Sequence, residues 1–146
     1  MDDGLRSTVA SRLQAVNQRA TASRQTIVSV LGQASRPLTI PEILETPDGR
    51  SLAQSSVYRN LVVLEEAGLV RRVVTDDEFT RYELAEDLTE HHHHLVCVRC
   101  GRIEDVPADA HLERSLADAT EEIARTTGFR TQHHRIDLVG LCRQCA

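Results

Sequence analysis

The stretch that decides the fold is "TIPEILETPDGRSLAQSSVYRNLVVLEEAGLVRRVV", residues 39–74. It opens with Thr39 and carries Glu42 three residues later, which is the pattern of a capping box. Pro41, in what would be the first turn, suits the start of a helix because its missing N–H has no partner there. The turn sequence "TPDGRS" follows. This part of the stretch therefore predicts a short helix and then a turn.

The rest of the stretch predicts a longer helix and the start of a hairpin. Val57, Leu61 and Leu64 recur at helical spacing, and Gly68 is suited to end the helix in a left-handed conformation. "LVRRVVT", "DDE" and "FTRYEL" then predict a strand, a turn and a strand. Two earlier helices are predicted from apolar residues at helical spacing: Leu5, Val9, Leu13 and Val16, then Ile27, Val28 and Leu31.

This order of elements predicts a winged helix-turn-helix domain over residues 1–84, which would place the helix after the turn in the major groove of double-stranded DNA. Arg24, at the start of the second helix, is a candidate contact to phosphate. Short polar groups, an aromatic ring and a guanidinium stand near the start of the predicted recognition helix as further candidates: Gln54, Ser55, Ser56, Tyr58 and Arg59. A solvated helix face is the alternative interpretation of the short polar residues.

Composition narrows the class of protein. The 146 residues are 40% hydrophobic and 27% charged, without an apolar run long enough to span a membrane. The formal net charge of -5 argues against coating nucleic acid by bulk charge, although it leaves room for a local basic face. The N-terminal residues lack the basic and apolar regions of a signal peptide, so we expect a cytoplasmic protein without a membrane partner.

The second half carries a different chemistry. All seven histidines and all four cysteines fall within residues 91–146, after a polar stretch "AEDLTE" at residues 85–90 that we interpret as a hinge. "VRCGRIEDV" and "FRTQHHRIDLVGLCRQC" predict strands, with a helix between them that Gly128 can end. The apolar face of that helix is predicted at Leu112, Leu116, Ala119 and Ile123. Together the halves predict an α+β protein, a winged helix-turn-helix domain followed by a small α/β domain.

Two Cys-x-x-Cys pairs give the strongest signal for a metal: Cys97 and Cys100, then Cys142 and Cys145. Four thiolates are a donor set that tetrahedral zinc takes in closed structural sites, because no coordination position is left open for chemistry. The sequence therefore predicts a structural Zn²⁺ that staples the second domain. A redox dithiol is the alternative.

Four consecutive histidines, 91–94, precede the first cysteine pair. If this run is extended, His92 and His94 point to one face and His91 and His93 to the other, because side chains alternate along a strand. One run can then serve two metal sites, each completed by carboxylates or further histidines. A purification tag would be terminal and longer, and the remaining alternative is a solvated polar strand.

These residues resemble the ferric uptake regulator family of metal-dependent repressors. The resemblance covers nearly the whole chain and is carried by "TASRQTIVSVL", "SSVYRNLVVLEEAGLV", "HHHHLVCVRCG", "GFRTQHHRIDLVGLC" and "CRQC". It implies a homodimer that binds a palindromic DNA operator through its winged helices and pairs through its C-terminal domains. It also implies that a divalent metal acts as co-repressor by fixing the hinge, and that the four cysteines hold structural zinc.

Residue by residue, the resemblance implies two further metal sites. The regulatory site would use Glu83, His92, His94 and Asp105. The second site would use His91, His93, Glu113 and His134, with His111 and Asp118 as alternatives for the helix acid. The segment "SRPLT", residues 35–39, holds no histidine, whereas iron and peroxide sensors of the family usually supply one there.

Donors that are all nitrogen and oxygen make iron(II) the first choice of effector, with zinc and manganese as alternatives. Peroxide sensing is a further alternative within the family. A zinc-dependent hydrolase and a zinc-dependent interaction module are rival classes. No His-Glu-x-x-His motif and no nucleophile motif supports an enzyme, so we expect none.

Overall fold

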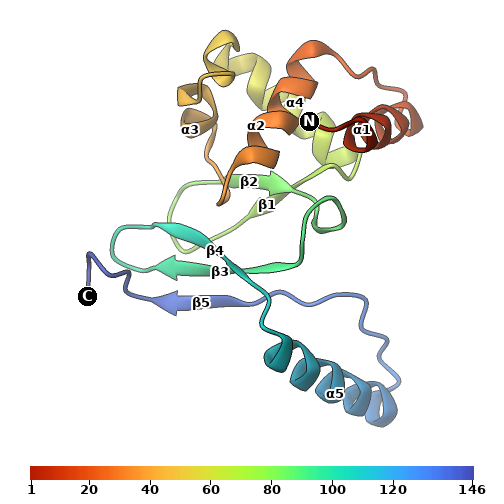
Figure 1. Cartoon of the computed structure of the whole chain (residues 1–146), viewed down its shortest axis with the longest axis vertical. Coiled ribbons are helices and arrows are strands. Elements are labelled where there is room, and N and C mark those ends of the chain that lie inside the picture. Colours follow the sequence, from red (N-terminus) through yellow and green to blue (C-terminus); the bar gives the residue numbers. More distant parts are fainter. The chain divides into compact units, whose positions relative to one another are not determined.

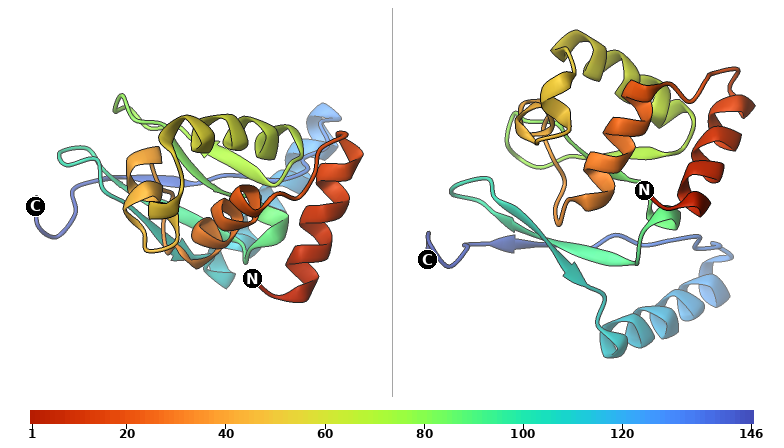
Figure 2. Two further views of the ribbon diagram at one scale, coloured as in Figure 1. Left: turned by 90° about the horizontal axis from the view of Figure 1, so that it is seen from above. Right: turned by 45° about the horizontal axis from the view of Figure 1, so that its top comes forward.

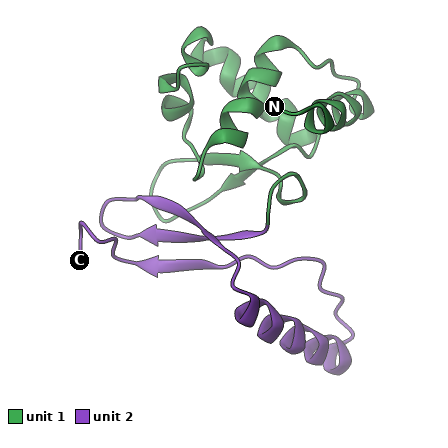
Figure 3. Cartoon of the chain, in the orientation of Figure 1, with its two compact units in different colours: residues 1–90 green, residues 91–146 purple.

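The computed structural model describes residues 1–146 as an α+β chain of two compact units, residues 1–90 and 91–146 (Figure 3). The first unit contains α1 (Asp3–Ala15), α2 (Ala22–Gln33), α3 (Ile40–Glu45), α4 (Gln54–Glu66), β1 (Val70–Val73) and β2 (Arg81–Leu84). The second unit contains β3 (His92–Cys97), β4 (Ile103–Pro107), α5 (Ala110–Thr127) and β5 (Asp137–Gly140). None of the helices combines the length and the apolar character needed to cross a bilayer.

Local sequence signals explain where the helices of the first unit begin and end. The capping box at α3 is confirmed: Glu42 Oε2 accepts the Thr39 backbone N–H at 2.8 Å, and Thr39 Oγ1 accepts the Glu42 N–H. Thr21 caps α2 in the same way by accepting the N–H of Arg24. Gly68, with φ of 65°, ends α4 in the left-handed region as expected.

The core of the first unit forms where the apolar stripes of its helices meet. Leu13, Ile27, Ile43, Leu61 and Leu64 are fully buried, and they come from α1, α2, α3 and α4. The antiparallel pair β1–β2 closes this core, and the helices gather along it (Figures 1 and 2). The result is a winged helix-turn-helix domain, in which α3, a turn and α4 are followed by the β1–β2 wing.

The second unit is built on a three-stranded sheet with the order β4-β3-β5. The central strand β3 pairs antiparallel with β4 and parallel with β5, so that Asp105 and Asp137 flank His94 from the two sides. The first turn of α5 follows β4, and the helix then extends away from the sheet (Figure 1). No residue of α5 is buried, although its apolar stripe is present.

Two predicted strands are longer than the strands observed. In "VRCGRIEDV" the chain turns at residues 98–101, where Gly101 takes a φ of 72°, and the strand begins only at Ile103. The turn brings Cys100 back towards Cys97, which an extended strand could not do. In "FRTQHHRIDLVGLCRQC" only Asp137–Gly140 is a strand, because the pairing with β3 begins at His94. His133 and His134 therefore precede β5.

Residues 85–90, which we interpreted as a hinge, contain one 3₁₀ turn, Glu86–Leu88. Asp87 forms an ion pair with Arg12 of α1, which also donates a hydrogen bond to the carbonyl of Gly68 at 2.6 Å. Arg71 of β1 lies 3.5 Å from the Glu86 carboxylate. The segment that follows the wing is thus tied back to α1 and to β1.

Candidate metal centres and nucleic-acid interface

The four cysteines lie together at one end of the second unit. Their sulfur atoms all lie within 4.8 Å of one another, and the Cys100 and Cys142 sulfurs are 3.8 Å apart. A zinc ion with Zn–S bonds of about 2.3 Å has tetrahedral sulfur–sulfur edges of about 3.8 Å, whereas a disulfide joins its sulfurs at about 2 Å. No disulfide is present. The geometry fits a Cys₄ zinc site.

Backbone groups prepare this site for a cation. Hydrogen bonds from the backbone, first from Cys142 and then from Cys100, lower the pKa of the Cys97 thiol to about 6. A thiol that loses its proton this readily is available as a thiolate ligand near neutral pH. By contrast, the side-chain hydrogen bond with Cys142 raises the pKa of Cys145 to about 12. Without a cation, only part of the cluster can therefore carry negative charge at once.

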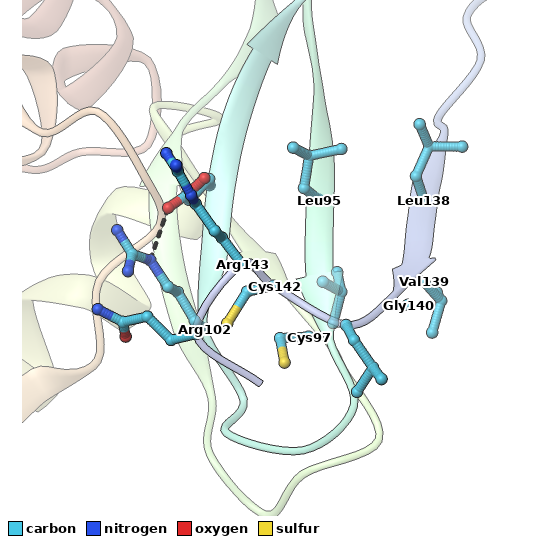
Figure 4. Close-up of a pocket in the computed structure, with 12 residues that line it drawn as sticks. Leu95, Cys97, Arg102, Leu138, Val139, Gly140, Cys142 and Arg143 are labelled. Carbon is cyan, nitrogen blue, oxygen red and sulfur yellow. Dashed lines mark ion pairs between the residues drawn. The ribbon is translucent and has the colours of Figure 1, made fainter. Parts of the chain in front are cut away.

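An open hollow of about 560 Å³ adjoins the cysteines along the sheet (Figure 4). Leu95 of β3 and Leu138 and Val139 of β5 line it, and all three are exposed. Arg102 Nε and Glu104 Oε1 form an ion pair of 2.6 Å on its other side. The hollow supplies apolar surface beside the four cysteines, two of which, Cys97 and Cys142, line it.

The first histidine cluster is His91, His93, Glu113 and His134. Their candidate ligand atoms lie within 4.8 Å of one another. Glu113 Oε1 lies 2.6 Å from His93 Nε2, and Glu113 Oε2 lies 2.9 Å from His134 Nε2. The His93 contact, with support from the other two imidazoles, holds the pKa of Glu113 below its usual value. Three imidazoles and an ionised carboxylate are a donor set for zinc, iron or manganese.

The structure thus brings Glu113, the first choice of helix acid, to the histidines. His111 and Asp118, the alternatives, are exposed on α5 outside the cluster. His134 reaches the cluster from the segment before β5, whereas its neighbour His133 is exposed. His93 is 3% exposed, and its Nδ1 has no hydrogen-bond partner.

The second histidine cluster uses the opposite face of β3. His92, His94 and Asp105 present candidate ligand atoms within 4.8 Å of one another, and His94 Nε2 lies 3.8 Å from Asp105 Oδ1. The two clusters confirm the predicted alternation of the four histidines along the strand. Asp137, which the sequence did not single out, lies 3.0 Å from His94 Nδ1. Its place depends on strand pairing between residues 43 apart, which leaves no local signal in the sequence.

The remaining predicted ligand, Glu83, lies on β2 of the first unit. Its side chain is 8% exposed, and its Oε1 accepts from Arg71 Nε at 2.6 Å across the wing. Arg72 forms two hydrogen bonds to the Glu65 carboxylate, of 2.8 and 3.0 Å. Both wing arginines are thus paired with carboxylates, Arg71 with Glu83 and Arg72 with Glu65.

The predicted DNA contacts fall into two groups. Gln54, Ser55, Tyr58 and Arg59 are exposed and line one shallow surface at the start of α4. Arg24 instead directs its guanidinium inward. It donates to Asn60 Oδ1 at 3.1 Å, to the Arg19 carbonyl at 2.7 Å and to Gln18 Oε1 at 2.8 Å.

Ser56 belongs with the inward group. Its carbonyl and its hydroxyl accept from the Asn60 amide at 2.9 and 3.1 Å. Arg24, Asn60 and Ser56 therefore form a continuous chain of hydrogen bonds that fixes the first turns of α4 against α2. The exposed surface of α4 remains the part suited to bases and phosphates.

Comparison with known proteins decides the class. The model of the ferric uptake regulator family matches residues 15–139, which include α2 to α4, the wing, both histidine clusters and three of the four residues of β5. The chain belongs to the ferric uptake regulator family. This confirms the resemblance read from the sequence, and the family consists of metal-responsive regulators of transcription that bind DNA.

Individual relatives within the family differ in what they respond to. The peroxide-responsive repressor PerR of Staphylococcus saprophyticus is 31% identical over 130 residues, 87% of this chain and 82% of that protein. A ferric uptake regulator of Pseudomonas aeruginosa, solved with manganese, has a TM-score of 0.70 at 27% identity, over 92% of this chain and 98% of that one. The Fur protein of Helicobacter pylori matches with a TM-score of 0.74 at 24% identity, over 98% and 92% of the two chains, which supports the fold alone.

Proposed function

We propose that this regulator is a repressor whose DNA binding is switched on by a divalent metal, with iron(II) as the first candidate. The observation that carries the proposal is the division of four consecutive histidines between two faces of β3, each with a carboxylate in reach. Imidazole and carboxylate donors suit iron(II), zinc and manganese, and the affinity series alone does not select iron. Availability in the cell would decide between them.

In this proposal the regulatory site is formed by Glu83, His92, His94 and Asp105. Glu83 lies on the wing before residues 85–90 and the other three lie after them. A bound divalent ion supplies a crosslink across that segment. The binding free energy then favours one orientation of the winged helix, as a ligand favours whichever state it binds more tightly. That orientation presents Tyr58 and Arg59 to an operator.

The second site, His91, His93, Glu113 and His134, joins α5 to the sheet. A metal there would fix the first turn of a helix that has no buried residue of its own. The four cysteines would hold structural zinc, whose binding contributes directly to the folding of the second unit. The family to which the chain belongs consists of regulators of transcription, and on that ground we propose that the protein is not an enzyme.

We further propose that the working form is a homodimer on a palindromic operator. The apolar stripe of α5 includes Ile123, which is 46% exposed, and β5 is an edge strand with Leu138 and Val139 exposed. Apolar surface of this kind is costly in water and is typical of an interface. A second copy would cover the same patch on both subunits, and two winged helices would then meet two half-sites.

Peroxide sensing is a second candidate, favoured by the 31% identity to a peroxide-responsive repressor. Against it stands the absence of histidine in residues 35–39, where such sensors usually supply a ligand. Treating the iron-loaded protein with hydrogen peroxide separates the two functions. Loss of DNA binding together with oxygen added to a histidine would favour the peroxide sensor.

Anaerobic DNA binding tests the proposed function. A duplex is selected from random sequence by the iron-loaded protein, and its affinity is then measured with iron(II), zinc, manganese or a chelator. We expect tight binding only with metal. His92→Ala and His94→Ala should lose the metal response, whereas His133→Ala, which removes an exposed histidine, should keep it. Equal affinity with and without metal would contradict the proposal.

A further inference from the structure

Asp137 stands outside every ligand set considered above, yet its carboxylate contacts His94. Asp137 Oδ1 lies 3.0 Å from His94 Nδ1. The two residues are direct partners in the parallel β3–β5 pair, so their side chains project from the same face of the sheet. The His94 N–H also donates to the Ile136 carbonyl at 3.1 Å, which fixes the register beside this contact.

The other nitrogen of the same ring faces the regulatory cluster. His94 Nε2 lies 3.8 Å from Asp105 Oδ1, on the side where His92 also stands. The His94 side chain is only 4% exposed, so its ring cannot turn freely into water. Each ring nitrogen therefore has a separate task, with Nδ1 towards Asp137 and Nε2 towards the cluster.

We propose that Asp137 is a positioning residue that selects the tautomer of His94. An ionised carboxylate only accepts hydrogen bonds, so the contact requires the proton to sit on Nδ1. Nε2 then carries the lone pair that a metal needs, and the ring is already oriented to offer it. The second carboxylate oxygen, Asp137 Oδ2, lies 3.8 Å from Arg135 Nη2, so Oδ1 is the oxygen that faces His94.

The other cluster provides the contrast. His93 Nδ1, the ring nitrogen that does not contact Glu113, is buried and has no hydrogen-bond partner. No carboxylate on that nitrogen therefore holds the ring as Asp137 holds His94. The two histidine clusters therefore differ in how firmly their ligands are prepared. The role given to His94 rests on the proposed function. The contact between Asp137 and His94 does not depend on it.

The first test needs no metal. Long-range ¹H–¹⁵N correlation spectra of the zinc-replete protein, with the regulatory metal absent and at a pH above the imidazole titration, report which ring nitrogen of His94 carries the proton. We expect the Nδ1–H form in the natural sequence and a mixture or the Nε2–H form in Asp137→Ala. An Nε2–H tautomer in the natural sequence would overturn the inference, whatever the protein does with metal or DNA.

The second test measures affinity. Competition with a chelator for iron(II) or cobalt(II) should show a loss of about 10- to 100-fold for Asp137→Ala, the usual effect of removing an outer carboxylate. Asp137→Asn, which keeps an acceptor but not the charge, should lose less. Asp118→Asn, on exposed α5, is the matched control and should bind normally.

The two tests separate failure of the inference from failure of the proposed function. The Nδ1–H tautomer with no metal bound at His92 and His94 would leave the positioning intact and refute the regulatory site. Normal metal affinity in Asp137→Ala would refute the positioning role. The cobalt(II) absorption spectrum should keep its donor set and change only in band position, whereas loss of one oxygen donor would identify Asp137 as a direct ligand and overturn the inference.

Discussion

Replacing Arg24 with alanine tests whether this residue shapes the recognition helix or touches DNA. Its guanidinium donates three hydrogen bonds, to Asn60, Arg19 and Gln18. At a net 0.5 to 1.5 kcal/mol for each bond, and towards the lower end because the site is partly exposed, the loss should be about 2 kcal/mol. Urea unfolding of the zinc-bound protein should therefore show a lower free energy of unfolding for Arg24→Ala.

DNA binding separates the two roles. Each phosphate contact contributes a slope of about -0.9 to the dependence of log affinity on log salt concentration. Arg24→Ala should lower the affinity through a loosened α4 and leave this slope unchanged. Arg59→Ala is the matched control, since Arg59 is exposed on the outer surface of α4 and should change the slope but hardly the stability. Unchanged stability together with a reduced slope in Arg24→Ala would refute the reasoning.

Three other changes have expected outcomes. Asp77→Ala removes both hydrogen bonds that Asp77 accepts from buried Arg81 of the wing, of 2.8 and 2.6 Å, and should cost about 2 kcal/mol by urea unfolding at pH 7. Arg81 lowers the pKa of Asp77 from the usual 3.8, so this stabilisation is full above that value and the difference between the proteins should shrink as pH falls below it. Gly68→Ala should cost about 1 kcal/mol by thermal unfolding, because φ is 65° but a Cβ would meet nothing within 4 Å. Cys142→Ser should abolish bound zinc, measured by elemental analysis, and lower the protection of β3 and β5 amides from hydrogen exchange; full protection without zinc would contradict this.

Much of the first unit could be predicted because its signals are local. A capping box marks the start of α3, a left-handed glycine marks the end of α4, and an apolar stripe marks the buried side of each helix. Each of these depends on residues within a few positions of one another. From the sequence, Arg24 was a candidate contact to phosphate. In the structure it donates to Asn60, which lies 36 residues away, so no local pattern indicated this contact.

The second unit was less predictable because its contacts are long-range. The alternation along β3 could be read from four consecutive histidines, and so could the donors that two Cys-x-x-Cys pairs supply. The extent of β5 and the pairing of Asp137 with His94 could not, since both depend on which register the parallel strands adopt. The strand predicted over "VRCGRIEDV" therefore ran through the turn at residues 98–101. The strand predicted over "FRTQHHRIDLVGLCRQC" was expected to begin before Asp137, where β5 begins.

That register links the three candidate metal sites. Shifting β3 by one residue would exchange its faces and send each histidine to the wrong cluster. Cys97 ends β3 and Cys142 closely follows β5, so the cysteine cluster joins these two strands at one end, where the Val98 N–H also donates to the Gly140 carbonyl at 2.9 Å. A zinc ion that staples this end would hold the register on which the division of the histidines depends. The structural site is in that sense a condition for the other two, and loss of zinc should impair both histidine clusters even though no ligand is shared.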